Sequence, residues 1–311
     1  MCKWQSKYLP GYECKVPAEP GSEYCIFHEP GEKDVEKFKE KFYEQIDEVG
    51  PESQRNGRFD FRGYIFPIGI RVSSIAPDEL GSSRVILPRE IGLPLLCSES
   101  CINGDSSFDG AMINGDVRFD QAVINGSISF EEAAIEGDLS YVDARVKGAI
   151  TYQSATINGT ASFFGATIGG DALFPWVTIR GHVSFYGARI MGNALFFDGV
   201  LEEGADFDSV TIEGAADFTR AVIRGKTSFV IAVFSRMLEL RDAAFEGEVV
   251  FGSCRAGGLD LARLYRGEGI TAVICSLCRI SASLTNSVHK PICATVSRRT
   301  GKRNVGQSCM T

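Results

Sequence analysis

The stretch AMINGDVRFDQ, at residues 111–121, is followed directly by AVINGSISFEE, at residues 122–132. The two segments match position by position, with a small residue, a large aliphatic residue, Asn-Gly and an aromatic ring at the same places. A repeat of fixed period is the signature of a solenoid, in which each unit packs only on its neighbours. The pattern continues in both directions, so we predict a repeat array over residues 86–258.

Four columns of residues keep this 11-residue period. One column is small and starts at Ala111, and one consists of glycines and includes Gly115. The other two columns are large and apolar, which predicts that they form the core. The aromatic column is Phe108, Phe119, Phe130, Tyr141, Tyr152, Phe163, Phe174, Phe185, Phe196, Phe207, Phe218 and Phe229. The aliphatic column includes Ile113, Ile124, Ile135, Ile157 and Ile168.

Inside one unit, apolar and polar residues alternate, as expected for strand side chains that point alternately inward and outward. Asn114-Gly115 marks a corner, where we expect glycine because it accepts a positive φ. The spacing of three residues from Phe119 to Ala122 resets the alternation and predicts a second corner.

Two geometries fit these units. In a parallel β-helix each unit is half of a coil, whereas in an antiparallel meander each Asn-Gly closes a hairpin. A single-layered meander would leave the aromatic column in water. Burial of one such side chain contributes roughly 1.5–3 kcal/mol, so the enclosed form is favoured. The predicted fold class is therefore mainly β, a right-handed parallel β-helix.

The unit resembles two pentapeptide-repeat modules, Ala-x-Ile-x-Gly and Val-x-Phe-x-x, joined with one inserted residue, as in the Phe-rich branch of the pentapeptide-repeat proteins. The resemblance covers about half of the chain. It implies a four-sided right-handed β-helix in which Ala111 and Val117 are the small inward residues, and Ile113 and Phe119 the large ones. The inserted residue and the glycine column depart from the family pattern, which puts the squareness of the coil in doubt.

The flanks of the array predict the remaining organisation. Residues 32–50 read as an amphipathic helix, with Phe38 and Phe42 on its apolar face, and we expect it to cap or dock. Residues 57–85 read as N-terminal capping strands. An open solenoid end invites strand pairing, so a homodimer through a terminal coil is a further expectation. Beyond Gly258 the columns lose their phase, and we expect residues 259–311 to be degenerate or poorly ordered.

The first 31 residues predict a zinc knuckle. Cys2, Cys14, Cys25 and His28 have the C-x11-C-x10-C-x2-H spacing, and four Cys and His ligands suit a closed tetrahedral structural Zn²⁺. This motif is similar to a Cys-Cys-Cys-His knuckle that precedes some pentapeptide-repeat arrays. It also resembles a plant module containing Trp-Arg-Cys that is linked to DNA.

A second ligand pattern lies near the C-terminus. Cys275, Cys278, His289 and Cys293 have the C-x2-C-x10-H-x3-C spacing, which allows a second metal site. The alternative is that they are unrelated groups in a degenerate tail.

Charge and composition bound the function. The formal net charge is −8, with 22 acidic and 11 basic residues between Cys97 and Gly258. An acidic array argues against broad binding of phosphate backbones, although a basic tail follows it. We interpret outward acids such as Asp109, Asp116, Asp120, Glu131, Glu132 and Asp138 as a solvating surface. No signal-peptide pattern or apolar run of membrane-spanning length is present, and the ten cysteines favour a cytoplasmic protein.

Catalysis is not expected. The chain has three histidines, His28, His182 and His289, and neither a nucleophile with a base nor a phosphate-binding loop is apparent. The main hypothesis is a non-catalytic scaffold with a protein partner. Two alternatives remain. The family resemblance implies a DNA-mimicking modulator of a type II topoisomerase, and the zinc knuckle with the basic tail allows nucleic-acid binding.

Overall fold

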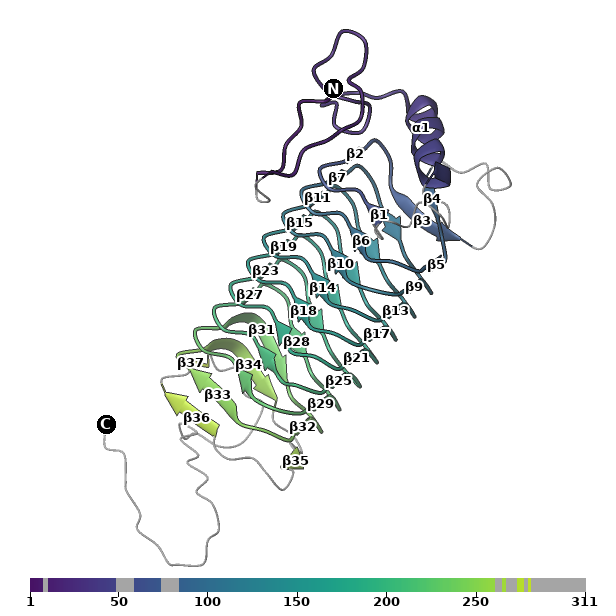
Figure 1. Cartoon of the computed structure of the whole chain (residues 1–311). Coiled ribbons are helices and arrows are strands. Elements are labelled where there is room, and N and C mark those ends of the chain that lie inside the picture. Colours follow the sequence, from purple (N-terminus) through teal and green to yellow (C-terminus); the bar gives the residue numbers. More distant parts are fainter. Residues whose placement is uncertain are drawn as a thin grey trace, which may run out of the picture.

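The computed structural model describes residues 1–7, 11–48, 59–73, 84–260, 265–266, 273–276 and 279–280. These residues form a rod of stacked coils, with the N-terminal segment and helix α1 (Val35–Glu48) at one end (Figure 1). All pairings between the named strands are parallel, and partners such as Val117 and Leu139 stand one coil apart in the chain. In the regular part of the array each coil takes 22 residues, which is two sequence units. The parallel solenoid is confirmed and the antiparallel meander is excluded.

The strands form four stacks, which we call faces I to IV in the order in which one coil visits them. The four-sided coil that the resemblance implies is therefore present despite the inserted residue. Face I contains β5 (Glu90–Ile91), β9 (Met112–Ile113), β13 (Ala134–Ile135), β17 (Thr156–Ile157), β21 (Thr178–Ile179), β25 (Val200–Leu201), β29 (Val222–Ile223), β32 (Ala244–Phe245) and β35 (Tyr265–Arg266). Face II contains β1 (Phe59–Asp60), β6 (Leu95–Leu96), β10 (Val117–Arg118), β14 (Leu139–Ser140), β18 (Ala161–Ser162), β22 (Val183–Ser184), β26 (Ala205–Asp206), β30 (Thr227–Ser228), β33 (Val249–Gly252) and β36 (Val273–Ser276).

Faces III and IV belong to one sheet because the longer strands β31 (Val233–Glu239) and β34 (Arg255–Asp260) run along both. Face III otherwise contains β2 (Ile65–Phe66), β7 (Cys101–Ile102), β11 (Val123–Ile124), β15 (Arg145–Val146), β19 (Thr167–Ile168), β23 (Arg189–Ile190), β27 (Thr211–Ile212) and β37 (Arg279–Ile280). Face IV otherwise contains β3 (Ile70–Ser73), β4 (Val85–Pro88), β8 (Ser106–Ser107), β12 (Ile128–Ser129), β16 (Ile150–Thr151), β20 (Ala172–Leu173), β24 (Ala194–Leu195) and β28 (Ala216–Asp217).

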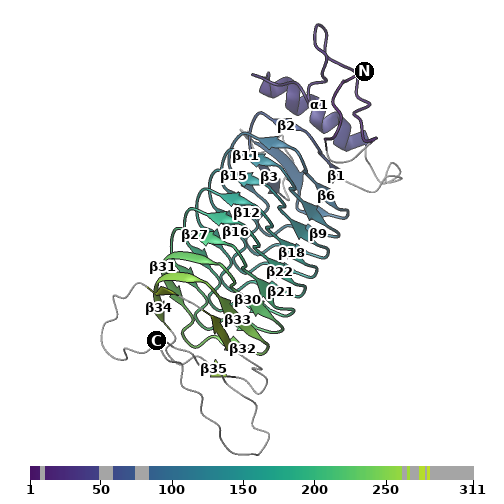
Figure 2. The same cartoon turned by 90° about the vertical axis from the view of Figure 1, so that its left-hand side faces the viewer.

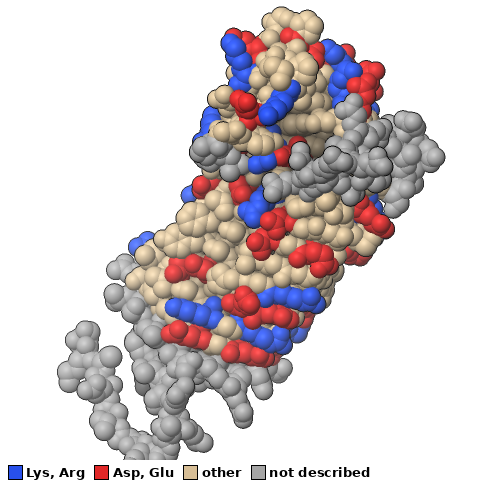
Figure 3. Space-filling view, viewed as in Figure 1, with Lys and Arg blue, Asp and Glu red and all other residues tan. Residues whose placement is uncertain are grey.

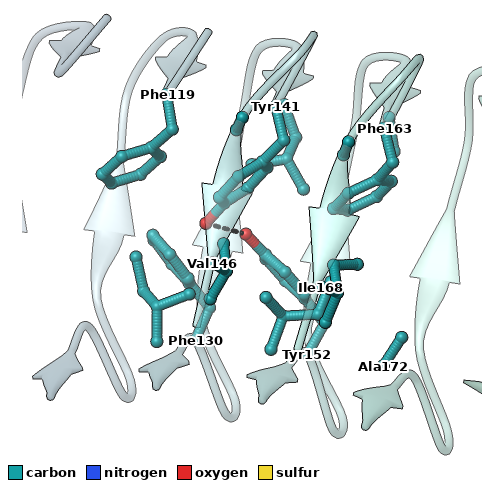
Figure 4. Packing of buried hydrophobic residues seen from close by; sticks show 14 of the residues in the cluster. Phe119, Phe130, Tyr141, Val146, Tyr152, Phe163, Ile168 and Ala172 are labelled. Atoms are coloured by element: carbon teal, nitrogen blue, oxygen red, sulfur yellow. Dashed lines mark hydrogen bonds between the residues drawn. The ribbon is translucent and has the colours of Figure 1, made fainter. Parts of the chain in front are cut away.

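The interior is filled by the two apolar columns. The aromatic rings form two ladders, because rings one coil apart stack in parallel and rings half a coil apart meet edge to face. Phe163 stacks on Phe185 with centroids 4.6 Å apart, and its centroid lies 5.4 Å from that of Phe174 at a right-angled contact. Where the two ladders contain tyrosine, the Tyr152 hydroxyl donates a 2.9 Å hydrogen bond to the Tyr141 hydroxyl (Figure 4). This pair satisfies two buried hydroxyl groups inside an otherwise apolar core.

The glycine column has a different cause from the one expected. Most of its members, Gly159 among them, have no φ in the left-handed region. Each instead lies against the backbone of the preceding coil: a Cβ on Gly159 would lie 2.6 Å from the carbonyl carbon and oxygen of Gly137. Gly159 N also donates to Gly137 O at 3.1 Å. The positive-φ explanation is wrong for these glycines, and close approach of the coils replaces it.

A column of left-handed residues stands at the second corner, two positions after each residue of the column that is aromatic in most units. Their φ values lie between 52° and 66°, and this corner accepts side chains as different as Asp, Arg, Trp and Ile. The column is Glu99, Gly110, Gln121, Glu132, Asp143, Ser154, Gly165, Trp176, Gly187, Asp198, Ser209, Arg220, Ile231, Asp242 and Ser253.

Several outward acids have a structural role in addition to the solvating role expected of them. Asp116 Oδ1 accepts a hydrogen bond from the backbone N–H of Asp138, and Asp138 Oδ1 accepts one from Thr160 N at 2.8 Å. Asp109 and Asp120 accept N–H groups of the next coil in the same way. These carboxylates tie successive coils together.

The segment beyond Gly258 continues the strand pairing. Strand β34 runs to Asp260, and β35, β36 and β37 pair in parallel with β32, β33 and β34. Parallel pairing therefore continues past the boundary that loss of the column phase suggested.

The N-terminal end is covered by α1, which Figures 1 and 2 place against the first coils. Phe38 and Phe42 are fully buried, and the Phe42 ring lies 5.2 Å from the ring of Phe61 and 5.7 Å from that of Phe66. The hydroxyl of Tyr43 accepts the backbone N–H of Ile86 at 2.8 Å. The helix therefore closes the apolar mouth of the first coil.

In the view of Figure 3, acidic and basic side chains lie side by side at the C-terminal end of the described rod, while much of the rod surface above them carries neither charge.

Candidate metal centre

The N-terminal segment brings Cys2, Cys14, Cys25 and His28 together. One ligand atom from each lies within 4.8 Å of all the others. Two backbone hydrogen bonds hold the ligands near one another. Cys2 N donates to Val16 O at 2.9 Å, and in the turn after Cys25 the N–H of His28 donates to Cys25 O at 3.0 Å. The four residues that the spacing predicted thus form one cluster.

The distances fit a tetrahedral ion. With Zn–S about 2.3 Å and Zn–N about 2.0–2.1 Å, a tetrahedron separates two sulfurs by roughly 3.8 Å and a sulfur from a nitrogen by roughly 3.6 Å. Cys14 Sγ lies 3.8 Å from Cys25 Sγ, and His28 Nδ1 lies 3.7 Å from Cys2 Sγ and 3.1 Å from Cys25 Sγ. The residues present therefore fit Zn²⁺ with four protein ligands.

Surrounding groups orient these ligands. His28 Nε2 lies 3.3 Å from the carbonyl oxygen of Arg62, so the ring donates there and leaves Nδ1 free to bind a metal. The indole of Trp4 stacks on the imidazole at 4.5 Å. The backbone N–H groups of Trp4 and Val16 donate to the sulfurs of Cys2 and Cys14, each two residues earlier.

The electrostatics of the cluster favour the thiolate form at Cys25. A hydrogen bond from the Cys14 thiol, together with the neighbouring His28, lowers the pKa of Cys25 to about 4, while the same bond and burial raise the pKa of Cys14. Lys33 donates its ammonium to Ile26 O near the cluster, and burial lowers the pKa of Lys33 to about 8 although the charge of Cys25 opposes this shift. A bound divalent ion would favour the deprotonated form of all three cysteines, because thiolate rather than thiol is the metal ligand.

The cluster is joined to the solenoid. Ile65 N, on the first strand of face III, donates to Phe27 O at 2.7 Å, and the Phe27 ring stacks on Tyr64 at 4.7 Å. Ser6 and Lys7 both donate to the carboxylate of Glu99. The segment that carries the ligands is therefore bonded directly to the edge of the first coil.

Sequence reasoning did not identify Trp4, Lys33 or Arg62 as parts of this site. The position of Trp4 two residues after Cys2 was an available signal, whereas Arg62 contributes a backbone oxygen that no sequence pattern reveals. In the second ligand set, only the backbone of Cys275 is described, within β36; Cys278, His289 and Cys293 lie outside the described residues. His182 sits at a corner with Nδ1 3.2 Å from Glu203 O.

A family profile described as pentapeptide repeats (9 copies) matches residues 207–255. The same columns, at the same period and with the same four-sided coil, run through the rest of the array. Residues 207–255 therefore carry pentapeptide repeats, and the other coils share their pattern. No curated protein matches the chain.

Among solved structures, the chain is similar to HetL, a pentapeptide repeat protein involved in heterocyst differentiation regulation from the cyanobacterium Nostoc sp. strain PCC 7120. The sequences are 15% identical, and the match covers 75% of this chain and 96% of HetL with a TM-score of 0.20.

Proposed function

We propose that this protein is a non-catalytic scaffold for protein interactions, a rigid pentapeptide-repeat rod whose N-terminal end is closed by a zinc-stabilised cap. The observation that supports this proposal is the separation of inward and outward side chains within each coil. Inward positions are fully used for packing, so recognition is left to outward side chains on a surface whose spacing is fixed by the coils.

The chemistry of the ligand cluster supports a structural ion. Three cysteines and one histidine supply all four positions of a tetrahedron, whereas a catalytic zinc keeps one position for water. The ion would tie residues 1–28 to each other and hold Phe27 against the first coil. Zn²⁺ is our proposed cofactor on this ground.

Further parts of this proposal rest on composition. In the described part of the chain no helix is both long enough and apolar enough to cross a membrane. No disulfide joins Cys2, Cys14, Cys25, Cys97, Cys101 and Cys254, which fits the reducing cytoplasm that we propose as the compartment. End-to-end pairing of two copies stays a prediction, to be checked by sedimentation at several concentrations. The comparisons lend no support to a topoisomerase or nucleic-acid role.

The zinc site is tested by metal content and thermal melting of Cys25→Ser. Cys101→Ser is the matched control, since Cys101 is a half-buried thiol outside the cluster. We expect one zinc per chain in the wild type and the control, and loss of zinc with a lower melting temperature in Cys25→Ser. Equal zinc content in all three proteins would refute the proposed zinc site.

The scaffold function is tested by quantitative pull-down from a native lysate with the full zinc-loaded chain as bait. We expect a stoichiometric protein partner that resists nuclease treatment. Recovery of nucleic acid alone, or of no bound material, would overturn the proposal.

A further inference from the structure

The outward position on face IV changes character along the rod. Its residues occupy equivalent places in successive coils and, because strands in a sheet stack about 4.8 Å apart, they form a straight row. The row begins with hydroxyl side chains, passes through two leucines and ends in three carboxylates. In order it reads Ser107, Ser129, Thr151, Leu173, Leu195, Asp217, Glu239 and Asp260.

The apolar part of this row extends around the neighbouring corner. Leu173 and Leu195 are direct partners in the parallel ladder. Trp176, at the left-handed corner, is 50% exposed, and its ring lies 5.0 Å from that of Phe197 in an edge-to-face contact. Clustered apolar side chains on a soluble surface mark interaction sites, and tryptophan is a preferred anchor at interfaces.

The acidic part of the row carries an electrostatic cost. Asp217 faces Glu239 and Glu239 faces Asp260 in the ladder, and like charges directly opposite each other are destabilising. Burial, with the charge of Asp217 adding to it, raises the pKa of Glu239, although the charge of Arg241 opposes this shift.

The nearby cations are already engaged. Arg220 pairs with Asp198 and Arg241 pairs with Asp260. Within the described ranges no lysine or arginine lies within ion-pair distance of Asp217 or Glu239. A partner that supplied positive charge here would relieve the repulsion.

We propose that this row, from Leu173 to Glu239 with Trp176 beside it, binds a basic amphipathic segment of a partner protein. Apolar side chains of the segment lie on the leucines and the indole, and its Lys or Arg side chains face the two carboxylates. This inference rests on the scaffold function proposed above and names the chemistry of the partner. From Leu173 to Glu239 the row spans roughly 14 Å, a length that about five extended residues cover.

The rigidity of the surface favours such binding. Backbone hydrogen bonds between coils hold the row in place. Binding of a partner therefore costs little conformational entropy in the rod. The two parts of the row also impose a direction, because a segment with apolar residues at one end and basic residues at the other fits only one way along the rod.

The probe is a synthetic peptide of about 12 residues with leucines in its first half and arginines in its second half. A matched peptide carries glutamate in place of arginine. Binding to the full zinc-loaded chain is followed by calorimetry at low and at moderate salt, because screening weakens contacts between charges. We expect the arginine peptide to bind, with an affinity that falls as salt rises, and the glutamate peptide not to bind.

Two pairs of variants locate the binding. Leu195→Ser changes the row, whereas Phe164→Ser changes an exposed ring elsewhere on the rod. Asp217→Asn and Asp206→Asn are matched, since each aspartate ends a two-residue strand and accepts a 2.8 Å hydrogen bond from the N–H two residues later. Leu195→Ser should weaken binding at least about tenfold, and Asp217→Asn should reduce its salt dependence, while both controls bind like the wild type.

Several outcomes would overturn this inference. They are equal binding of both peptides, equal losses in the row variants and the controls, no binding of the arginine peptide, and a dimer of the chain that Leu195→Ser abolishes. A pull-down partner that Leu195→Ser does not affect would refute the row as the binding site and leave the scaffold function standing.

Discussion

Gly159→Ala separates the two explanations for the glycine column. The added Cβ would lie 2.4 Å from Asp138 Oδ1 and 2.6 Å from the carbonyl group of Gly137. Relief of both contacts requires wider separation of two coils and also loss of the hydrogen bond from Thr160 N to Asp138. Overpacking costs about 1–3 kcal/mol and loss of a hydrogen bond to a charged group about 1.5–3 kcal/mol. Alanine restricts the unfolded chain, which returns about 0.4–1 kcal/mol, so the net loss is about 1.5–5.6 kcal/mol.

Gly187→Ala is the matched control. Gly187 has a φ of 66°, and a Cβ there would meet nothing within 4 Å. The left-handed conformation costs alanine about 1–2 kcal/mol and the unfolded-state effect returns about 0.4–1 kcal/mol. The expected net loss is therefore about 0–1.6 kcal/mol, well below that of Gly159→Ala.

Both variants are measured by urea unfolding followed by far-UV circular dichroism. Because solenoids unfold in parts, amide hydrogen exchange of the affected coils is measured beside it. If Gly187→Ala lost as much stability as Gly159→Ala, conformational freedom would explain the glycines, and close approach of the coils would be refuted as their cause.

Three further predictions concern the tyrosine pair and the cap. Tyr152→Phe should lower the free energy of unfolding by about 1–3 kcal/mol, measured by urea unfolding, because it leaves the buried Tyr141 hydroxyl without a partner. Adding Tyr141→Phe should recover part of that loss. Additive losses would contradict a direct hydrogen bond. Burial raises the pKa of both tyrosines above the unfolded value of about 10. Above about pH 10 the unfolded chain therefore releases these protons before the folded chain does, and stability falls as pH rises. A pH series should show a shallower decline in the double variant, and an unchanged slope would contradict this linkage. Removal of metal by a chelator should lower the melting temperature and increase binding of a hydrophobic dye, as the cap releases Phe38 and Phe42; an unchanged melt would separate the cap from the metal.

The sequence was sufficient for the fold because the signal was periodic. The rings of one column, such as Phe163 and Phe174, repeat at a spacing that only stacked coils can bury together. The ligand cluster was also predictable, since Cys25 and His28 form a tight knuckle whose chemistry is independent of the surrounding fold.

Other features could not be predicted because they depend on contacts between coils. The half-coil repeat does not reveal that Gly159 meets Gly137, 22 residues earlier, or that Asp138 caps an N–H group in the next coil. The row on face IV was hidden for the same reason, because Leu195 and Asp217 become neighbours only when alternate units are aligned. The half-coil spacing predicts the core, and only the full coil predicts the surface.

This difference between the two periods has an evolutionary consequence. Duplication of a single 11-residue unit would keep every ring and every corner in its column, so the core would tolerate it. All outward residues after the insertion would move to the opposite face of the rod. A row such as that on face IV would then be divided between two sides. Duplication of two units would instead lengthen the row and preserve its side. Copying errors of one unit can therefore redistribute binding surfaces without a cost in folding, whereas errors of two units extend them.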